Sequence, residues 1–194
     1  KNVRLNNGVM MPAIGFGVFQ IPENETEERN DAIEIGYRKF DTAAAYFNEE
    51  QLGNAIRQSG IKREEFFITT KLWVQDYEYD DALRAFDLSM KNSGWTISTS
   101  LDAQTYGNYY AAWRAMERLY KEGRIRLSGL RVSLMNAARP FLHNEIKPVV
   151  NQLETHPFSS SRLPMLSYSR KASSTKHGRL LLKAEDIFNH PTLK

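Results

Sequence analysis

Strand-like and helix-like segments alternate along most of this chain, and this alternation constrains its fold more than any other feature. "EFFITTKLW" (65–73) is apolar and β-branched, which is typical of a buried strand, and "PVVNQLETH" (148–156) is another strand candidate. Residues 80–94 and 108–123 instead carry apolar side chains at helical spacing, the former with Leu83, Phe86 and Met90 and the latter with Trp113, Met116 and Tyr120. Repeated strand–helix units predict parallel βαβ connections.

Two architectures satisfy this pattern, an open doubly wound sheet and a (β/α)₈ barrel. Polar residues follow several of the predicted strands, at Asp41, Lys71 and 154–156. They favour the barrel, because barrel active sites are built from the C-terminal ends of many strands. "GFGVFQ" (15–20) lacks the third glycine of a dinucleotide-binding loop, and no clear helix pattern begins there.

Composition sets limits on the class of protein. The chain has 194 residues, enough for one domain, and its net charge of +3 is spread along the sequence rather than gathered in a basic stripe. We therefore expect no nucleic-acid partner. Without cysteine there is no disulfide or thiolate metal site, and we predict no metal ion. No apolar run approaches the roughly 20 residues of a membrane span, so we expect no membrane association and a cytoplasmic location.

Two local signals mark turns and helix ends. Asn7-Gly8 lies between short apolar runs and predicts a tight hairpin within 3–12. Asn48 is a plausible N-cap for a helix that ends at Gly60.

The segments "FDTAAAY" (40–46) and "TTKLW" (69–73) contain residues that could carry out acid–base chemistry. A free tyrosine, with a pKa of about 10, is a poor acid at neutral pH. A nearby ammonium favours tyrosinate, and a carboxylate can fix that ammonium in place. Asp41, Lys71 and Tyr46 could thus form a tuned proton donor. The pattern alone also allows a strand-end salt bridge beside a surface aromatic, and that arrangement is commoner.

Five segments together resemble the aldo-keto reductases, specifically their 2,5-diketogluconate reductase-like microbial branch. They occur in the family's order over most of residues 3–158: "LNNGVMMPAIGFGVFQ", "AIEIGYRKFDTAAAYFNEEQLGNAI", "REEFFITTKLWVQDY", "AWRAMERLYKEGRIR" and "HNEIKPVVNQLETHPF". The resemblance implies a (β/α)₈ TIM barrel that binds NADPH without a Rossmann domain. It also implies reduction of small aldehydes and ketones to alcohols by a monomeric enzyme.

The same resemblance assigns catalytic roles to three residues. It makes Tyr46 the proton donor, Lys71 the partner that lowers the pKa of that tyrosine, and Asp41 the partner of Lys71.

The resemblance assigns further residues to ligand binding. Gln152 would contact the nicotinamide carboxamide, a role that its amide suits because it can donate and accept at once. Val18 and Asp41 would lie at the cofactor. Phe19 and Trp73 match aromatic positions at the substrate mouth, although ordinary core packing is an alternative for both.

Three segments, 93–107, 127–141 and 159–185, depart from the family pattern. "SGWTISTSLDAQTYG" (93–107) is polar where the family has an apolar strand that carries its fourth catalytic residue, a histidine. This segment contains no histidine. "SYSRKASSTKHGRLLLKAE" (167–185) reads as a Ser/Lys-rich linker.

Shifted reading frames restore much of the family pattern. Trp95–Ser100 can be encoded as TGG ACT ATA TCG ACC TC, which from one base earlier reads Leu-Asp-Tyr-Ile-Asp-Leu. Leu101–Thr105, written CTT GAT GCA CAA ACC, reads Leu-Met-His-Lys from its second base. Ser167–Glu185 is restored without a gap, and Leu127–Leu130 gives Ala-Ile-Gly-Val. We infer that these segments are out-of-frame translation of a reductase gene.

The frame shifts lead to expectations about structure and activity. We expect 93–107 and 159–185 to be irregular, because burying their polar side chains at strand positions would cost free energy. We also expect residues 1–194 to form a single truncated domain, an incomplete barrel, because a complete one has roughly 250 residues. The alternative to an active reductase is an impaired fragment or pseudoenzyme. A third alternative is a binding module on a barrel-like scaffold, since fold alone does not give function.

Overall fold

A sheet of seven parallel strands forms the centre of the protein. The computed structural model describes residues 1–21, 27–95, 100–104, 109–131, 145–146, 148–154 and 174–178. Each strand pairs with the next one along the chain, so the spatial order equals the sequence order. The strands are β3 (Phe16–Gly17), β4 (Lys39–Asp41), β5 (Phe67–Lys71), β6 (Ser100–Gln104), β7 (Ser128–Arg131), β8 (Val150–Glu154) and β9 (Ser174–Gly178).

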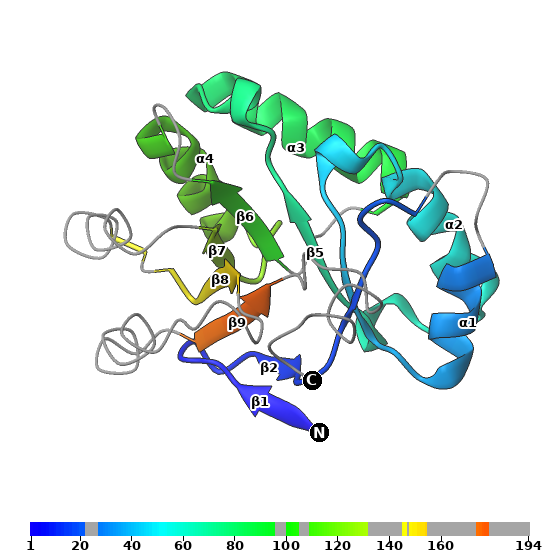
Figure 1. Ribbon diagram of the computed structural model, residues 1–194. Coiled ribbons are helices and arrows are strands. Elements are labelled where there is room, and N and C mark those ends of the chain that lie inside the picture. Colours follow the sequence, from blue (N-terminus) through cyan, green and yellow to red (C-terminus); the bar gives the residue numbers. More distant parts are fainter. Residues whose placement is uncertain are drawn as a thin grey trace, which may run out of the picture.

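Helices connect the first five of these strands and lie outside them. Four helices follow one another in an arc around the strands (Figure 1), as parallel neighbours require a crossover connection. They are α1 (Glu27–Ile35), α2 (Glu49–Gln58), α3 (Tyr79–Ser93) and α4 (Tyr109–Lys121), with 3₁₀ turns η1 (Ala44–Tyr46), η2 (Arg63–Glu65) and η3 (Val74–Asp76). The predicted strand–helix alternation is confirmed over this part of the chain.

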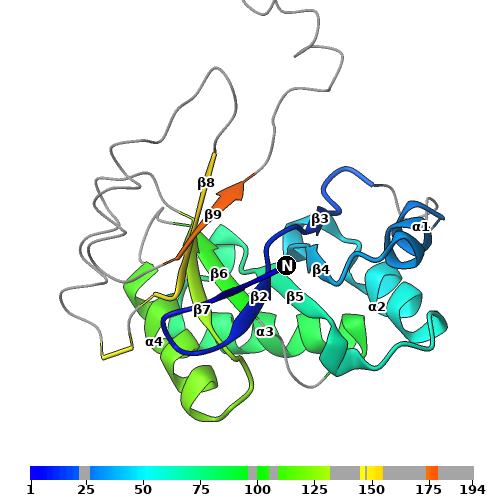
Figure 2. The same ribbon diagram turned by 90° about the horizontal axis from the view of Figure 1, so that it is seen from below.

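An antiparallel hairpin of β1 (Asn2–Arg4) and β2 (Met10–Pro12) precedes the sheet. Its turn has Gly8 at φ +86°, a conformation that suits glycine, so the predicted hairpin is confirmed. The hairpin covers the N-terminal end of the strands (Figure 2), because its apolar residues share a cluster with residues at or just before the starts of β5, β7 and β8. This cluster comprises Leu5, Met11, Phe67, Leu127, Val149 and Val150.

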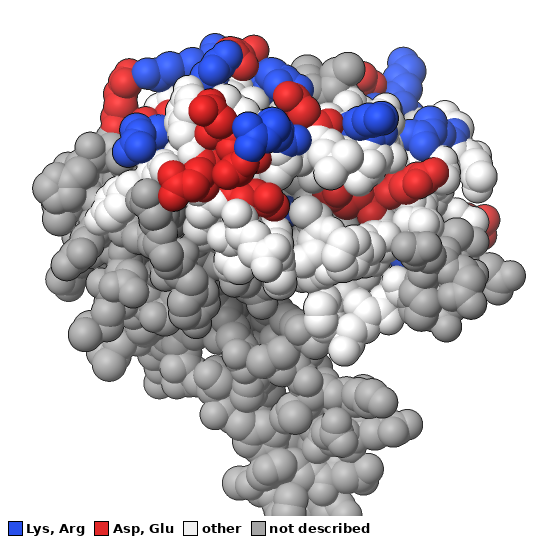
Figure 3. All heavy atoms as spheres, turned by 90° about the horizontal axis from the view of Figure 1, so that it is seen from above, with Lys and Arg blue, Asp and Glu red and all other residues white. Residues whose placement is uncertain are grey.

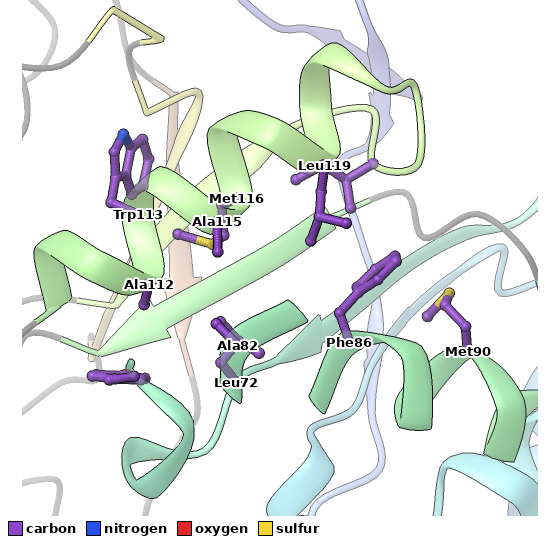
Figure 4. Close-up of a cluster of buried hydrophobic side chains, with 11 residues drawn as sticks. Leu72, Ala82, Phe86, Met90, Ala112, Trp113, Ala115, Met116 and Leu119 are labelled. Carbon is purple, nitrogen blue, oxygen red and sulfur yellow. The ribbon is translucent and has the colours of Figure 1, made fainter. Parts of the chain in front are cut away.

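Two further apolar clusters join the helices to the sheet. One lies between α3 and α4 (Figure 4), and it buries Phe86, Met90, Trp113 and Met116. Four of the six residues predicted to form apolar helix stripes are thus buried, and the other two are partly buried. The second cluster packs β4 and β5 against α1 and α2 around Phe40, Leu52 and Ile68.

Both segments that we expected to be irregular, 93–107 and 159–185, contain a strand, so that expectation is wrong for part of each. β6 pairs in parallel with both β5 and β7, and β9 pairs with β8. Main-chain hydrogen bonds from neighbouring strands do not depend on side-chain type, so a polar segment can complete a ladder. β7 likewise begins within 127–141. The remainder of 95–107, 132–141 and 159–185 lies largely outside the described residues.

Acidic and basic side chains intermix on the helix-covered face (Figure 3). Ion pairs join Asp87 to Arg124 and Arg118 to Glu122. Within the described residues, no helix is both long and apolar enough to cross a membrane. The same part of the chain has no group of three or more His, Asp or Glu side chains arranged to hold a metal ion.

Candidate active site

A lysine–aspartate pair lies at the C-terminal ends of two neighbouring strands. Asp41 ends β4 and Lys71 ends β5, and the parallel register of these strands brings their ends together. The Lys71 ammonium forms an ion pair with the Asp41 carboxylate and donates a hydrogen bond of 2.7 Å to the carbonyl oxygen of Thr42. Side-chain exposure is 5% for Lys71 and 19% for Asp41. The ammonium is therefore held by two oxygens in a largely buried position.

Tyr46 completes the arrangement. It ends η1, the turn that follows β4, and its ring centroid lies 5.2 Å from the Lys71 Nζ atom. The edge of one ring meets the face of the other between Phe19 and Tyr46, with centroids 4.8 Å apart and planes at 68°. The structure thus brings together the three side chains that the sequence suggested as a proton-donating group.

Gln152 reaches the same place from a strand far along the chain. It lies on β8, and its Nε2 atom donates a hydrogen bond of 3.4 Å to the second carboxylate oxygen of Asp41. Its Oε1 atom is buried and has no hydrogen-bond partner among the described residues. A buried acceptor normally has a donor, so this oxygen can accept an N–H group from a ligand.

The other predicted site residues differ in their placement. Phe19 touches Tyr46, as given above. Trp73 follows β5 by two residues and is 44% exposed, which leaves its ring accessible at the same end of the sheet. Val18 is fully buried in the core, where its N–H donates to the Asp41 carbonyl oxygen and its own carbonyl accepts from Asn48. Val18 therefore positions the loop and offers no exposed side-chain surface to a cofactor.

Sequence reasoning missed two polar residues beside the pair, Thr42 and Asn48. The carbonyl oxygen of Thr42 accepts a hydrogen bond from Lys71, and the Thr42 hydroxyl donates one to the Asn48 side chain. Asn48 stands at the N-cap position of α2, as predicted, but its side chain makes no capping hydrogen bond. Its side chain instead binds backbone carbonyls of the loop after β3. Those carbonyls lie about 30 positions earlier in the chain, and no local sequence signal points to them.

A buried carboxylate supports the outer side of β5. Glu49 accepts a hydrogen bond of 2.6 Å from the Thr70 hydroxyl. Burial raises the pKa of Glu49, and hydrogen bonds from Thr70 and Ser89 lower it in part. Successive residues of a strand point to opposite faces, so Thr70 faces the helices while Lys71 faces the site. Glu49 is therefore placed to support the strand and is not part of the lysine–aspartate pair.

Comparison with known proteins now decides the family. Residues 13–173 match the model of the Aldo/keto reductase family, well over half of the chain. The chain belongs to the aldo/keto reductase family. Glyoxal reductase of Bacillus subtilis (strain 168) is 44% identical over 160 residues, which cover 80% of this chain and 58% of that protein. The chain thus spans less than two thirds of this relative.

Solved structures identify the barrel. An aldo-keto reductase from a Medee basin deep-sea metagenome library superposes with a TM-score of 0.93 at 34% identity, covering 98% of this chain and 72% of that one. A Bombyx mori aldo-keto reductase in complex with NADP gives 0.86 at 24% identity, with coverages of 91% and 65%. The architecture is therefore that of the aldo/keto reductase (β/α)₈ barrel, and the doubly wound alternative is wrong.

Proposed function

We propose that this aldo/keto reductase reduces aldehydes or ketones to alcohols, with Tyr46 as the proton donor to the carbonyl oxygen. The observation that carries the proposal is the position of Tyr46 beside the Lys71–Asp41 pair. A cation 5.2 Å from the ring centroid stabilises the phenolate that remains when the tyrosine proton leaves. Asp41 and the Thr42 carbonyl keep that cation in place during the transfer.

We further propose NADPH as the cofactor, which when bound would supply the hydride. The unsatisfied Oε1 of Gln152 fits the N–H group of a nicotinamide carboxamide, and Asp41 adjoins it. Phe19 and Trp73 would provide apolar walls for a small carbonyl substrate. The sequence also leads us to propose a cytoplasmic monomer.

The decisive assay measures NADPH oxidation with an aromatic aldehyde. Tyr46→Phe should lower kcat by about 10²–10⁴, the usual contribution of a positioned general acid. Tyr120→Phe removes the same hydroxyl from the outer helix α4, remote from the pair, and should leave kcat unchanged. Full activity in Tyr46→Phe would remove Tyr46 as the proton donor.

A second candidate is a catalytically impaired member of the family. Residues 93–107 contain no histidine, although the family places its fourth catalytic residue there. We therefore expect the 194-residue chain to reduce carbonyls feebly or not at all, and the frame-restored protein to be active. Equal activity of the two proteins would refute this alternative. An intact mass near 22.4 kDa would establish that the protein is made with the printed sequence.

A further inference from the structure

Two residues beside the candidate active site have an unusual backbone conformation. Within the described part of the chain, Gln20 (φ 61°) and Phe47 (φ 54°) are the non-glycine residues with positive φ. A left-handed backbone is unfavourable for residues with a Cβ atom, so the surroundings must hold them there. Gln20 directly follows Phe19, and Phe47 directly follows Tyr46. The rings of Phe19 and Tyr46 are in contact.

Asn48 connects the two strained segments. Its Nδ2 atom donates hydrogen bonds to the carbonyl oxygens of Val18 (2.8 Å) and Ile21 (3.3 Å), which lie at the two ends of the turn that contains Phe19 and Gln20. Asn48 itself follows Phe47 and is only 1% exposed. One amide group therefore fixes the Phe19 turn against the Tyr46 turn.

The other end of the Asn48 side chain reaches the residue that holds the catalytic ammonium. Its Oδ1 atom accepts a hydrogen bond of 3.0 Å from the Thr42 hydroxyl. The Thr42 carbonyl accepts from Lys71 at 2.7 Å, and the Thr42 N–H donates to the Thr69 carbonyl at 2.8 Å. Both polar atoms of the Asn48 amide are thus used inside the protein, between the Phe19 turn and the end of β4.

We propose that Asn48 is a positioning residue for carbonyl reduction, acting through Phe19, Tyr46 and Lys71 without touching the reactants. This inference rests on the function proposed above. The hydrogen bonds of the Asn48 side chain fix Phe19, Tyr46 and Lys71 relative to one another. A displacement of about 1 Å at such groups can lower a rate by about 10²-fold.

Three variants separate this role from ordinary stabilisation. Asn48→Asp keeps the side-chain shape and the oxygen that accepts from Thr42. It replaces the donating amide NH₂ group with an oxygen that faces the carbonyl oxygens of Val18 and Ile21. Thr42→Val removes the hydroxyl bond and keeps the carbonyl that holds Lys71, so it provides a milder variant if Asn48→Asp folds poorly. Asn54→Asp is the matched control, because Asn54 lies on the same helix and bonds to Arg57 instead of the site loop.

Amide hydrogen exchange tests the connection without requiring turnover. Exchange in 16–21 and 42–47 should accelerate about tenfold in Asn48→Asp, and less in Thr42→Val, while α3 stays at the wild-type rate. Asn54→Asp should leave both site segments unchanged. Wild-type exchange at 16–21 and 42–47 in both site variants would overturn the proposal.

Kinetics then tests the consequence for the reaction, using whichever of the printed and frame-restored chains turns over. We expect kcat, expressed per NADPH-binding site so that unfolded protein does not count, to fall about 10–100-fold in Asn48→Asp and to stay at wild type in Asn54→Asp. Unchanged kcat per site in Asn48→Asp would overturn a positioning role. If Tyr46→Phe matches wild type, the proposed function fails instead, and the exchange result alone decides whether Asn48 joins the two segments.

Discussion

Replacing the buried carboxylate of Glu49 should make the stability of the protein less dependent on pH. Glu49 lies in the first turn of α2 with 5% exposure. Desolvation by burial is the largest influence and raises its pKa above the ordinary 4.5, against smaller lowering effects of hydrogen bonds from Thr70 and Ser89. The folded protein therefore holds this proton more tightly than the unfolded chain does.

The sign of the effect follows from linkage. A carboxyl group whose pKa is raised on folding contributes stability that is fully present below its unfolded pKa and is lost as pH rises through its folded pKa. Glutamine is neutral at every pH, so the unfolding free energy of Glu49→Gln should exceed that of wild type by an amount that grows above pH 4.5. Glu50→Gln, an exposed neighbour in the same turn, should show only the loss of a helix-dipole interaction, about 0.3–1 kcal/mol.

Removing the hydrogen bond from Thr70 to Glu49 should lower the free energy of unfolding by an amount that depends on the charge of Glu49. The Thr70 hydroxyl lies 2.6 Å from the Glu49 carboxylate and is almost fully buried. Thr70→Val keeps the shape and removes the donor, so it should cost about 1.5–3 kcal/mol where Glu49 is charged and about 0.5–1.5 kcal/mol where it is neutral. Urea unfolding at several pH values between about 4 and 8 would measure both variants. Parallel pH profiles for wild type and Glu49→Gln would refute the reasoning, because they would mean that folding does not shift this pKa.

Three further perturbations test the packing and the charge pair. Gly53→Ala should destabilise the protein by about 1–3 kcal/mol, because an added Cβ would lie 2.1 Å from the Ser93 carbonyl oxygen. Gly17→Ala is the control, since a Cβ added there meets nothing within 4 Å. Thermal unfolding should show a lower midpoint for the Gly53 variant than for the Gly17 variant. Phe86→Ala should cost about 3–5 kcal/mol in urea unfolding, since the ring is fully buried between α3 and α4. Asp41→Asn should destabilise by about 3 kcal/mol at neutral pH, because the buried ammonium loses its counter-charge, and a wild-type midpoint would contradict this.

The sequence predicted the elements whose own residues fix their conformation. β5 begins with apolar residues and continues with β-branched ones, β8 directly follows two apolar residues, and α3 and α4 show apolar residues at helical spacing, so each was recognisable alone. The meeting of Asp41 and Lys71 was also predictable, since neighbouring parallel strands end at the same edge. The approach of Gln152, 111 positions from Asp41, came only from the family resemblance.

The remaining features depend on partners distant in the chain. β6 is polar, and its place is given by pairing with β5 and β7 on either side. Asn48 was assigned to a helix cap because the local rule fits its position, yet its side chain binds Val18 and Ile21, which precede it by 30 and 27 positions. Local rules assign a polar side chain to its nearest backbone groups, and here tertiary structure offers better ones.

The three segments that differ from the family pattern, 93–107, 127–141 and 159–185, affect some parts of the candidate site and not others. The contacts that hold Lys71 come from Asp41, Thr42 and Tyr46, and all of these residues precede position 93. β6 supplies a backbone ladder beside β5 whatever its side chains are. A frame shift in 93–107 would therefore leave the proposed proton-donating group assembled and would change only the side chains of β6, where the family has its histidine. On this argument an impaired chain should keep its Lys71–Asp41 pair and lack only the side chain that the family supplies from this strand.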